Sequence, residues 1–100
     1  MNALPKEVTE GSLRVWWIPQ VPGKQFLVDV RNFEQAKLLL NVLANYDMFQ
    51  FKNKVKPDYC NAGGLQVLEA GEWVDYWTED GLEFDDLSME DCIKLDMDSV

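Results

Sequence analysis

Eight residues in the last third of the chain have side chains of the types that carry out chemistry or bind partners. Two are tryptophans and six are carboxylic acids: Trp73, Asp75, Trp77, Glu79, Asp80, Glu83, Asp85 and Asp86. Clustered carboxylates can hold a metal ion or act as general acid and base. Carboxylates beside tryptophans also suit contact with a basic protein, because tryptophans anchor interfaces and complementary charge speeds association.

The spacing of the acids does not match a calcium-binding loop. That loop has an acidic or amide residue at its first position, Gly at its sixth and Glu at its twelfth. Counting back from Gly81 places Tyr76 at the first position. We therefore expect no metal site, and we interpret the acids as a solvated face.

The residue types also argue against an enzyme. A catalytic carboxylate pair needs one acid in an apolar environment, and Asp75 between Trp73 and Trp77 is the one candidate. The chain has no His, so a nucleophilic Cys60 or Cys92 would depend on Lys or Asp as its base. We expect neither enzyme activity nor a cofactor.

Negative charge is concentrated at the C-terminal end. The chain has 100 residues, with nine Lys and Arg, 18 Asp and Glu, and a net charge of −9. Residues 1–71 carry eight basic and seven acidic residues, whereas residues 72–100 carry one basic and eleven acidic residues. Such a charge disfavours binding to nucleic acid or anionic membranes and favours a partner with a basic surface.

The cysteines and the N-terminus predict a cytoplasmic protein with reduced thiols. Cys60 and Cys92 are too few and too far apart for a disulfide framework, and residues 1–11 lack the apolar core of a signal peptide. The longest aliphatic run, Leu38-Leu39-Leu40, is far shorter than the ~20 apolar residues of a membrane-spanning helix, so we expect no membrane insertion.

The first half of the chain predicts a hairpin followed by a helix. Leu13–Ile18 and Phe26–Val30 are β-branched and aromatic, as is typical of antiparallel strands, and Pro22-Gly23 favours a type II turn between them. Alternation in the first strand predicts that Leu13, Val15 and Trp17 share one face. Asn32 is a favourable N-cap for an amphipathic helix over residues 33–46. We expect the apolar stripe of this helix, widened by Leu39, Val42 and Tyr46, to face a sheet.

The second half predicts another hairpin and a short helix. Residues 48–51 suit a short strand or a packed turn, and residues 61–64 suit a flexible joint. Strands are expected at residues 65–69 and 72–78, with a short edge strand at 82–84. Ser88 is a suitable N-cap for a helix over residues 88–96, docked by Leu87, Ile93 and Leu95.

Together these elements predict an α+β fold in ββαββ order. Two hairpins form an antiparallel sheet of four or five strands, and one amphipathic helix packs on it. We expect a single domain over residues 1–100, with its core at about 13–84 and an acidic short helix or tail at 85–100.

Four segments resemble a family of small accessory proteins of tailed phages and prophages, described as superinfection exclusion proteins. The segments are Arg14–Pro22, Asp47–Phe51, Lys56–Leu65 and Gly71–Val74, and the resemblance covers roughly residues 13–84. It implies a phage-encoded protein that acts inside the infected bacterium by binding another protein. It brings no catalytic residues.

The leading hypothesis is therefore a phage accessory protein that binds and inhibits or modulates a bacterial or prophage protein, in superinfection exclusion or counter-defence. The eight residues named first would form its contact surface. One alternative is an acidic mimic of nucleic acid that blocks a DNA- or RNA-binding enzyme. Another is a self-associating structural protein, a homodimer paired through Trp16 and Ile18 on the outer face of the first hairpin.

Overall fold

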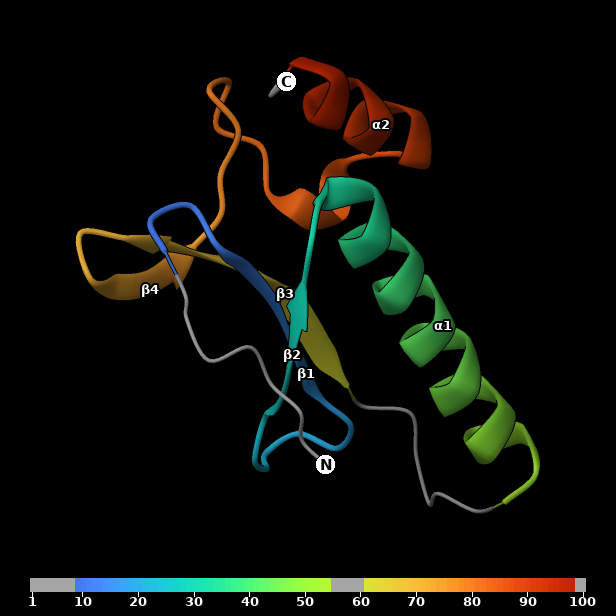
Figure 1. The fold of residues 1–100 in the computed structure, drawn as a ribbon. Coiled ribbons are helices and arrows are strands. Elements are labelled where there is room, and N and C mark those ends of the chain that lie inside the picture. Colours follow the sequence, from blue (N-terminus) through green and yellow to red (C-terminus); the bar gives the residue numbers. More distant parts are fainter. Residues whose placement is uncertain (1–8, 55–60, 99–100) are drawn as a thin grey trace.

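The computed structural model describes residues 9–54 and 61–98, which form four strands, two α-helices and one turn of 3-10 helix. In chain order these are β1 (Leu13–Ile18), β2 (Phe26–Val30), α1 (Phe33–Lys52), β3 (Ala62–Glu69), β4 (Glu72–Asp75), η1 (Phe84–Asp86) and α2 (Met89–Asp98). α1 lies along one face of the sheet, and α2 lies across the N-terminal end of α1 (Figure 1). The predicted α+β fold is confirmed.

The two hairpins are joined through their first strands. The antiparallel sheet has the order β2-β1-β3-β4, so β1 pairs with β2 on one edge and with β3 on the other. β1 is therefore shielded at both edges and, on one face, by α1. Its alternate residues Leu13, Val15 and Trp17 are all buried, as the expected alternation requires.

The turn between β1 and β2 is not the predicted type II turn. Gly23 lacks the positive φ that a type II turn requires at this position, and the Val21–Pro22 peptide bond is cis. A Cβ on Gly23 would lie 2.6 Å from the carbonyl oxygen of Gln20. The turn therefore uses the small size of glycine rather than its access to positive φ.

α1 begins at the predicted cap but ends later than predicted. The Asn32 side chain accepts a hydrogen bond from the backbone N–H of Gln35 at 2.8 Å, which confirms the N-cap. The helix continues to Lys52, so the short strand or turn expected at residues 48–51 is wrong. No Pro or Gly interrupts residues 33–52, and the helix ends where Asn53 donates from both its backbone and its side chain to the carbonyl of Phe49.

Only one side of α1 meets the sheet. Ala36 and Leu40 are buried there, whereas Val42 and Tyr46 are 52% and 56% exposed, so the expectation that these two face the sheet is wrong. Apolar residues lie almost all round this helix, and periodicity alone does not identify the buried side of such a helix.

Gly63 and Gly64 lie inside β3, so the flexible joint expected at residues 61–64 is wrong. They pair with Trp17 and Trp16 of β1, respectively. A Cβ on Gly63 would overlap the ring of Trp17, and a Cβ on Gly64 would lie 2.7 Å from Nε1 of Trp16. The two glycines make room for two indole rings, one on each face of the sheet.

The second hairpin turns at Ala70 and Gly71, both of which have positive φ. β4 ends at Asp75 rather than at residue 78, and beyond it Trp77 forms a single bridge to Glu83. The edge strand expected at residues 82–84 is reduced to this bridge, because Phe84 turns into the core and begins η1.

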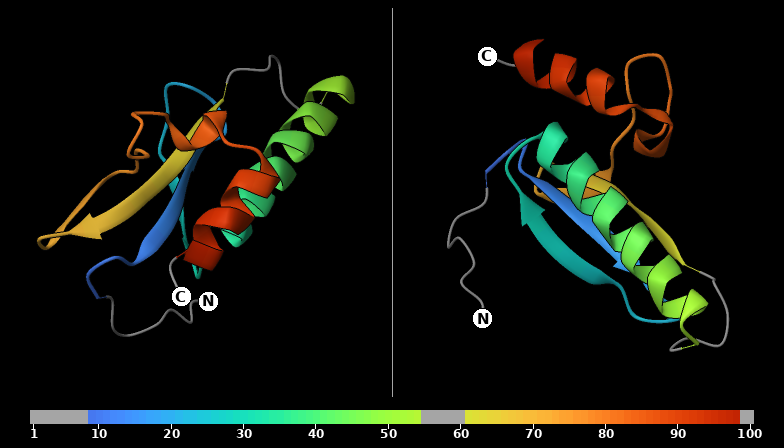
Figure 2. Two further views of the ribbon diagram at one scale, coloured as in Figure 1. Left: turned by 90° about the horizontal axis from the view of Figure 1, so that it is seen from above. Right: turned by 90° about the vertical axis from the view of Figure 1, so that its right-hand side faces the viewer.

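The core continues into the acidic C-terminal segment. Leu87 and Cys92 are buried in the same cluster as the sheet residues, and Leu95 packs against that cluster. The expected docking by Ile93 is wrong, since Ile93 is 36% exposed. Figure 2 shows α2 lying against the first turns of α1, where only one side of α2 is in contact.

Two acids of this segment act as helix caps. Asp91 accepts a hydrogen bond from the backbone N–H of Ser88, the predicted N-cap, whose Oγ accepts one from the N–H of Asp91. The hydrogen bond from the Ser88 backbone N–H to the carboxylate is the main cause that lowers the pKa of Asp91. Asp96 accepts from the backbone N–H groups of Phe33 and Glu34 at 2.8 and 2.9 Å, so a carboxylate of α2 caps α1.

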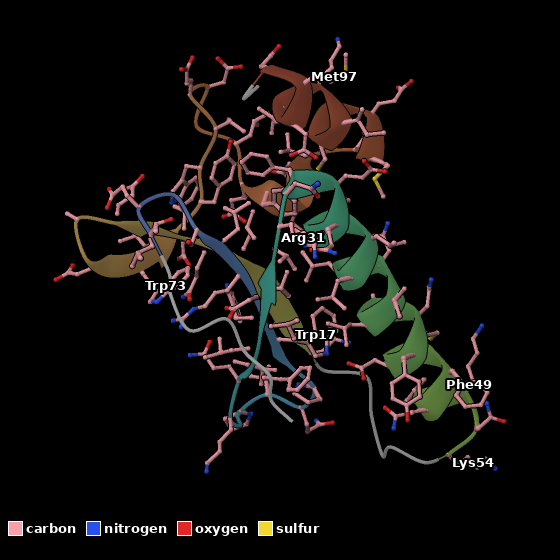
Figure 3. The ribbon with its side chains drawn as sticks, in the orientation of Figure 1. Trp17, Arg31, Phe49, Lys54, Trp73 and Met97 are labelled. Atoms are coloured by element: carbon pink, nitrogen blue, oxygen red, sulfur yellow. The ribbon has the colours of Figure 1, made fainter. Side chains whose placement is uncertain are left out.

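One carboxylate lies within the core. Asp47 is 2% exposed, and its Oδ2 accepts hydrogen bonds from Nε1 of Trp17 at 3.1 Å and from Nδ2 of Asn61 at 2.9 Å. Figure 3 shows Trp17 between the sheet and α1. Asp47 thus ties α1 to β1 and to the residue that precedes β3.

Stability should fall as the pH rises into the alkaline range. Burial raises the pKa of the Cys92 thiol and of the Tyr76 phenol. On unfolding, both groups return to ordinary pKa values of about 8.5 and about 10, so above about pH 8.5 the unfolded state binds fewer protons than the folded state. The contribution of the two groups to the free energy of unfolding is fully present below their pKa values in the unfolded state. It is lost as the pH rises through their raised pKa values in the folded state.

Urea unfolding between neutral pH and pH 10 measures this effect. Cys92→Ala should lower the free energy of unfolding at neutral pH and also flatten its fall with pH. The same pH slope with and without Cys92 would contradict the assignment.

Candidate functional site

The predicted contact residues of β4 lie on the face of the sheet that α1 does not cover. Trp73 pairs with Leu68 and Asp75 pairs with Gln66, in register with the outward-facing residues of β3. Tyr76 points to the other face, where its ring packs against that of Phe33. We call the side of the sheet opposite α1 the outer face.

A pocket of about 250 Å³ lies at the edge of β3 where β4 ends, between β1, β3 and the segment that follows β4. Its lining includes two tryptophans and three carboxylic acids: Trp16, Trp77, Asp75, Glu83 and Asp85. The glycine pair of β3, Gly63 and Gly64, also lines it. Three residues whose side chains pack in or against the core complete the lining: Leu65, Tyr76 and Phe84. We call this the outer-face pocket, because Trp16 and Asp75 line it from the outer face.

The chain geometry explains how these residues come together. β4 ends at Asp75, so the first half of β3 has no strand on the edge that faces away from β1, and η1 contacts β3. Because Gly64 has no side chain, the Trp16 ring can lie against the backbone of β3. Trp77 stands at the rim of the pocket, 54% exposed.

The pocket is suited to a cation. No ion pair joins its three acids to a basic side chain in the described part of the chain; the Lys37 ammonium group donates instead to the backbone carbonyl of Asp85, at 3.4 Å. Tryptophan rings attract cations through their negative faces, and carboxylates accept hydrogen bonds from ammonium and guanidinium groups. The outer face already contains such a contact, since the Arg14 guanidinium lies 4.2 Å from the centre of the Trp73 ring.

The other predicted contact residues lie elsewhere. Trp73 is outside the pocket, and the guanidinium group of Arg14 lies over its ring. Arg14 also donates a hydrogen bond from Nε to the side-chain oxygen of Gln66 at 2.8 Å. Glu79 and Asp80 line a second, wider cavity of about 560 Å³ between their turn and α2. Asp86 is exposed and lines neither cavity.

The sequence predicted a different surface for Trp16 and a flexible joint at the glycine pair. The structure places Trp16 in the same pocket as Trp77. A signal was present, because Trp16-Trp17 in one strand and Gly63-Gly64 in another are complementary in size. Large and small residues facing each other across a strand pair are a recognisable packing pattern.

Two further observations concern other types of site. Residues 9–54 and 61–98 contain no group of three or more Cys, Asp, Glu or His side chains arranged to hold a metal ion. Within the same ranges no helix is both long and apolar enough to cross a membrane. Cys92 is buried with a free thiol, and Cys60 lies outside the described residues.

Comparison with known proteins identifies the family. The family model described as superinfection exclusion gene product 17 matches residues 12–97, from β1 into α2. A superinfection exclusion protein of Salmonella phage P22 is 42% identical over an alignment of 80 residues. The match covers 67% of this chain and 78% of the phage protein. No solved structure matches the chain. The chain belongs to the superinfection exclusion gene product 17 family.

Proposed function

We propose that this protein acts in superinfection exclusion by binding a bacterial or prophage protein in the cytoplasm of the infected cell. Its outer-face pocket receives a Lys or Arg side chain from a basic surface of that partner. The observation that carries the proposal is the pocket itself, where Trp16 and Trp77 lie beside three carboxylates that form no ion pair with the described residues.

Both parts of this lining contribute to binding. A cation over a tryptophan ring gains about 0.5–2 kcal/mol, depending on how far it is removed from water. The carboxylates orient a guanidinium group through charge-assisted hydrogen bonds. The wider excess of acids in residues 72–100 speeds the encounter with a basic partner and repels acidic proteins.

Occupation of a basic surface also explains how so small a protein could exclude a second phage. A partner whose basic surface contacts incoming phage DNA or a phage protein loses that contact while the surface is covered. This mechanism needs no catalytic group in the exclusion protein. It depends on affinity and on the amount of protein in the cell.

Trp77→Ala should reduce binding about tenfold, because it removes an exposed aromatic anchor from the rim of the pocket. The assay has two parts: plating efficiency of a superinfecting phage on cells that express each variant, and affinity for the partner recovered from those cells. Trp77 is more than half exposed, so the fold should persist, as circular dichroism can verify.

A matched pair of charge variants separates the pocket from general electrostatic attraction. Glu83→Lys/Asp85→Lys and Glu79→Lys/Asp80→Lys change the net charge equally, but only the first pair lines the outer-face pocket. We expect the first variant to lose exclusion and the second to keep most of it. Equal losses in the two variants, or full exclusion by Trp77→Ala, would remove the pocket from the mechanism.

A further inference from the structure

The side of α1 that faces away from the sheet carries a continuous apolar stripe. Its members follow one another at spacings of four, four and three residues, so they lie on one side of the helix: Leu38, Val42, Tyr46 and Phe49. Each is more than half exposed, and the rings of Tyr46 and Phe49 stack with their centres 6.4 Å apart. Apolar side chains that are contiguous and exposed to this extent mark an interaction surface.

The stripe has charges of opposite sign at its two ends. Glu34 lies one turn before Leu38, whereas Lys52 and Lys54 follow Phe49. Asp47 is the only acid between Glu34 and Lys52, and it is buried on the other side of the helix. Phe49 and Lys54, labelled in Figure 3, lie at the C-terminal end of α1, whereas Arg31 lies in the link between β2 and the N-cap and is not part of the helix.

The stripe and the charges at its ends are complementary to those of a second copy whose α1 runs in the opposite direction. A two-fold axis through the middle of the stripe brings Val42 of each copy against Tyr46 of the other, and Leu38 against Phe49. The same axis brings Glu34 of each copy beside Lys52 and Lys54 of the other. Opposed helix dipoles also favour this antiparallel arrangement, whereas a parallel pair would place Glu34 beside Glu34 and lysine beside lysine.

We propose that the apolar stripe of α1 is the interface of an antiparallel homodimer. In Figure 2 no described element covers the outward side of α1, so a second copy can approach it. Self-association by a protein of net charge −9 needs a contact surface without exposed carboxylates at its centre, and the stripe meets this condition.

The size of the stripe sets the strength of the dimer. Burying four such side chains on each copy removes on the order of 1,000 Å² from water, which is at the lower limit for a specific interface. We therefore expect a dimer with a dissociation constant in about the micromolar range. No residue of the stripe lines the outer-face pocket, so both copies can still bind a partner.

Sedimentation equilibrium over a range of micromolar concentrations tests the proposal with three variants. Val42→Glu places a charge at the centre of the stripe and should weaken dimerisation at least tenfold. Glu34→Lys should weaken it too, and so should Lys52→Glu/Lys54→Glu, because each brings like charges together. An equal mixture of the last two variants should recover a heterodimer, detectable by native mass spectrometry, since both pairs of ends again have opposite charge.

Recovery in the mixture also shows that neither charge variant is merely unfolded. A wild-type protein that stays monomeric throughout would overturn the proposal, as would a mixture that stays monomeric. A dimer broken by Trp16→Ala but not by Val42→Glu would move the interface to the outer face. Flotation of the wild type with anionic vesicles, lost in Val42→Glu, would assign the stripe to a membrane surface instead.

Discussion

Replacing Asp47 with alanine should lower the free energy of unfolding by about 3–4 kcal/mol, which is large for a single substitution. The carboxylate accepts the indole N–H of Trp17 and an amide N–H of Asn61, and it is almost completely buried. Alanine would leave both donors without this acceptor and a gap where the carboxylate lies. Urea unfolding followed by tryptophan fluorescence measures the loss.

Two further variants identify the cause of the loss at Asp47. Asp47→Asn retains an oxygen that can accept from Trp17, so it should cost only about 1–2 kcal/mol. Asp29→Ala removes an exposed carboxylate from β2 and should change stability by less than about 0.5 kcal/mol. If Asp47→Ala were no more harmful than Asp29→Ala, the hydrogen bonds to Asp47 would not contribute to stability.

Gly63→Ala should lower the free energy of unfolding by about 3 kcal/mol, which is at the upper end of the losses caused by adding one methyl group to a packed core. The new Cβ would overlap the six-membered ring of Trp17. That indole has little freedom to move, because it is 7% exposed and its N–H is bonded to Asp47. Thermal and urea unfolding of the variant measure the effect.

Gly64→Ala is the matched control on the opposite face of the sheet. Its Cβ would approach Nε1 of Trp16 to 2.7 Å, but Trp16 lies at the open pocket and can move outward. We expect a loss of about 1 kcal/mol in stability together with a clear loss of partner binding. Equal destabilisation by the two alanines would mean that Trp16 and Trp17 are held equally firmly.

Local patterns accounted for most of the elements. The alternation in β1, the N-cap at Asn32 and the N-cap at Ser88 all depend on residues close together in the chain, and each prediction is confirmed. The errors arose where distant residues decide the outcome. Gly63-Gly64 has the composition of a loop, but two tryptophans of β1 require a strand without side chains at that place.

In the candidate site, too, the sequence predicted what neighbouring residues determine and missed what distant residues contribute. The sequence predicted that Asp75, Trp77, Glu83 and Asp85 are contact residues, and the structure places these four around one pocket. It did not indicate that Trp16 joins them, since Trp16 is about sixty positions away in the chain. Glu79 and Asp80, which are adjacent in sequence to the pocket residues, line a different cavity.

The carboxylates of this protein lie in environments that the sequence does not distinguish. The sequence by itself established an acidic C-terminal third without His and an α+β arrangement of hairpins and helices, because charge and short-range periodicity are properties of the chain alone. Only the tertiary structure separated Asp85, which lines the pocket, from Asp96, which caps α1, and from Asp47, which is buried against Trp17. The environment of a carboxylate depends on the groups that folding brings to it, and those groups come from distant parts of the sequence.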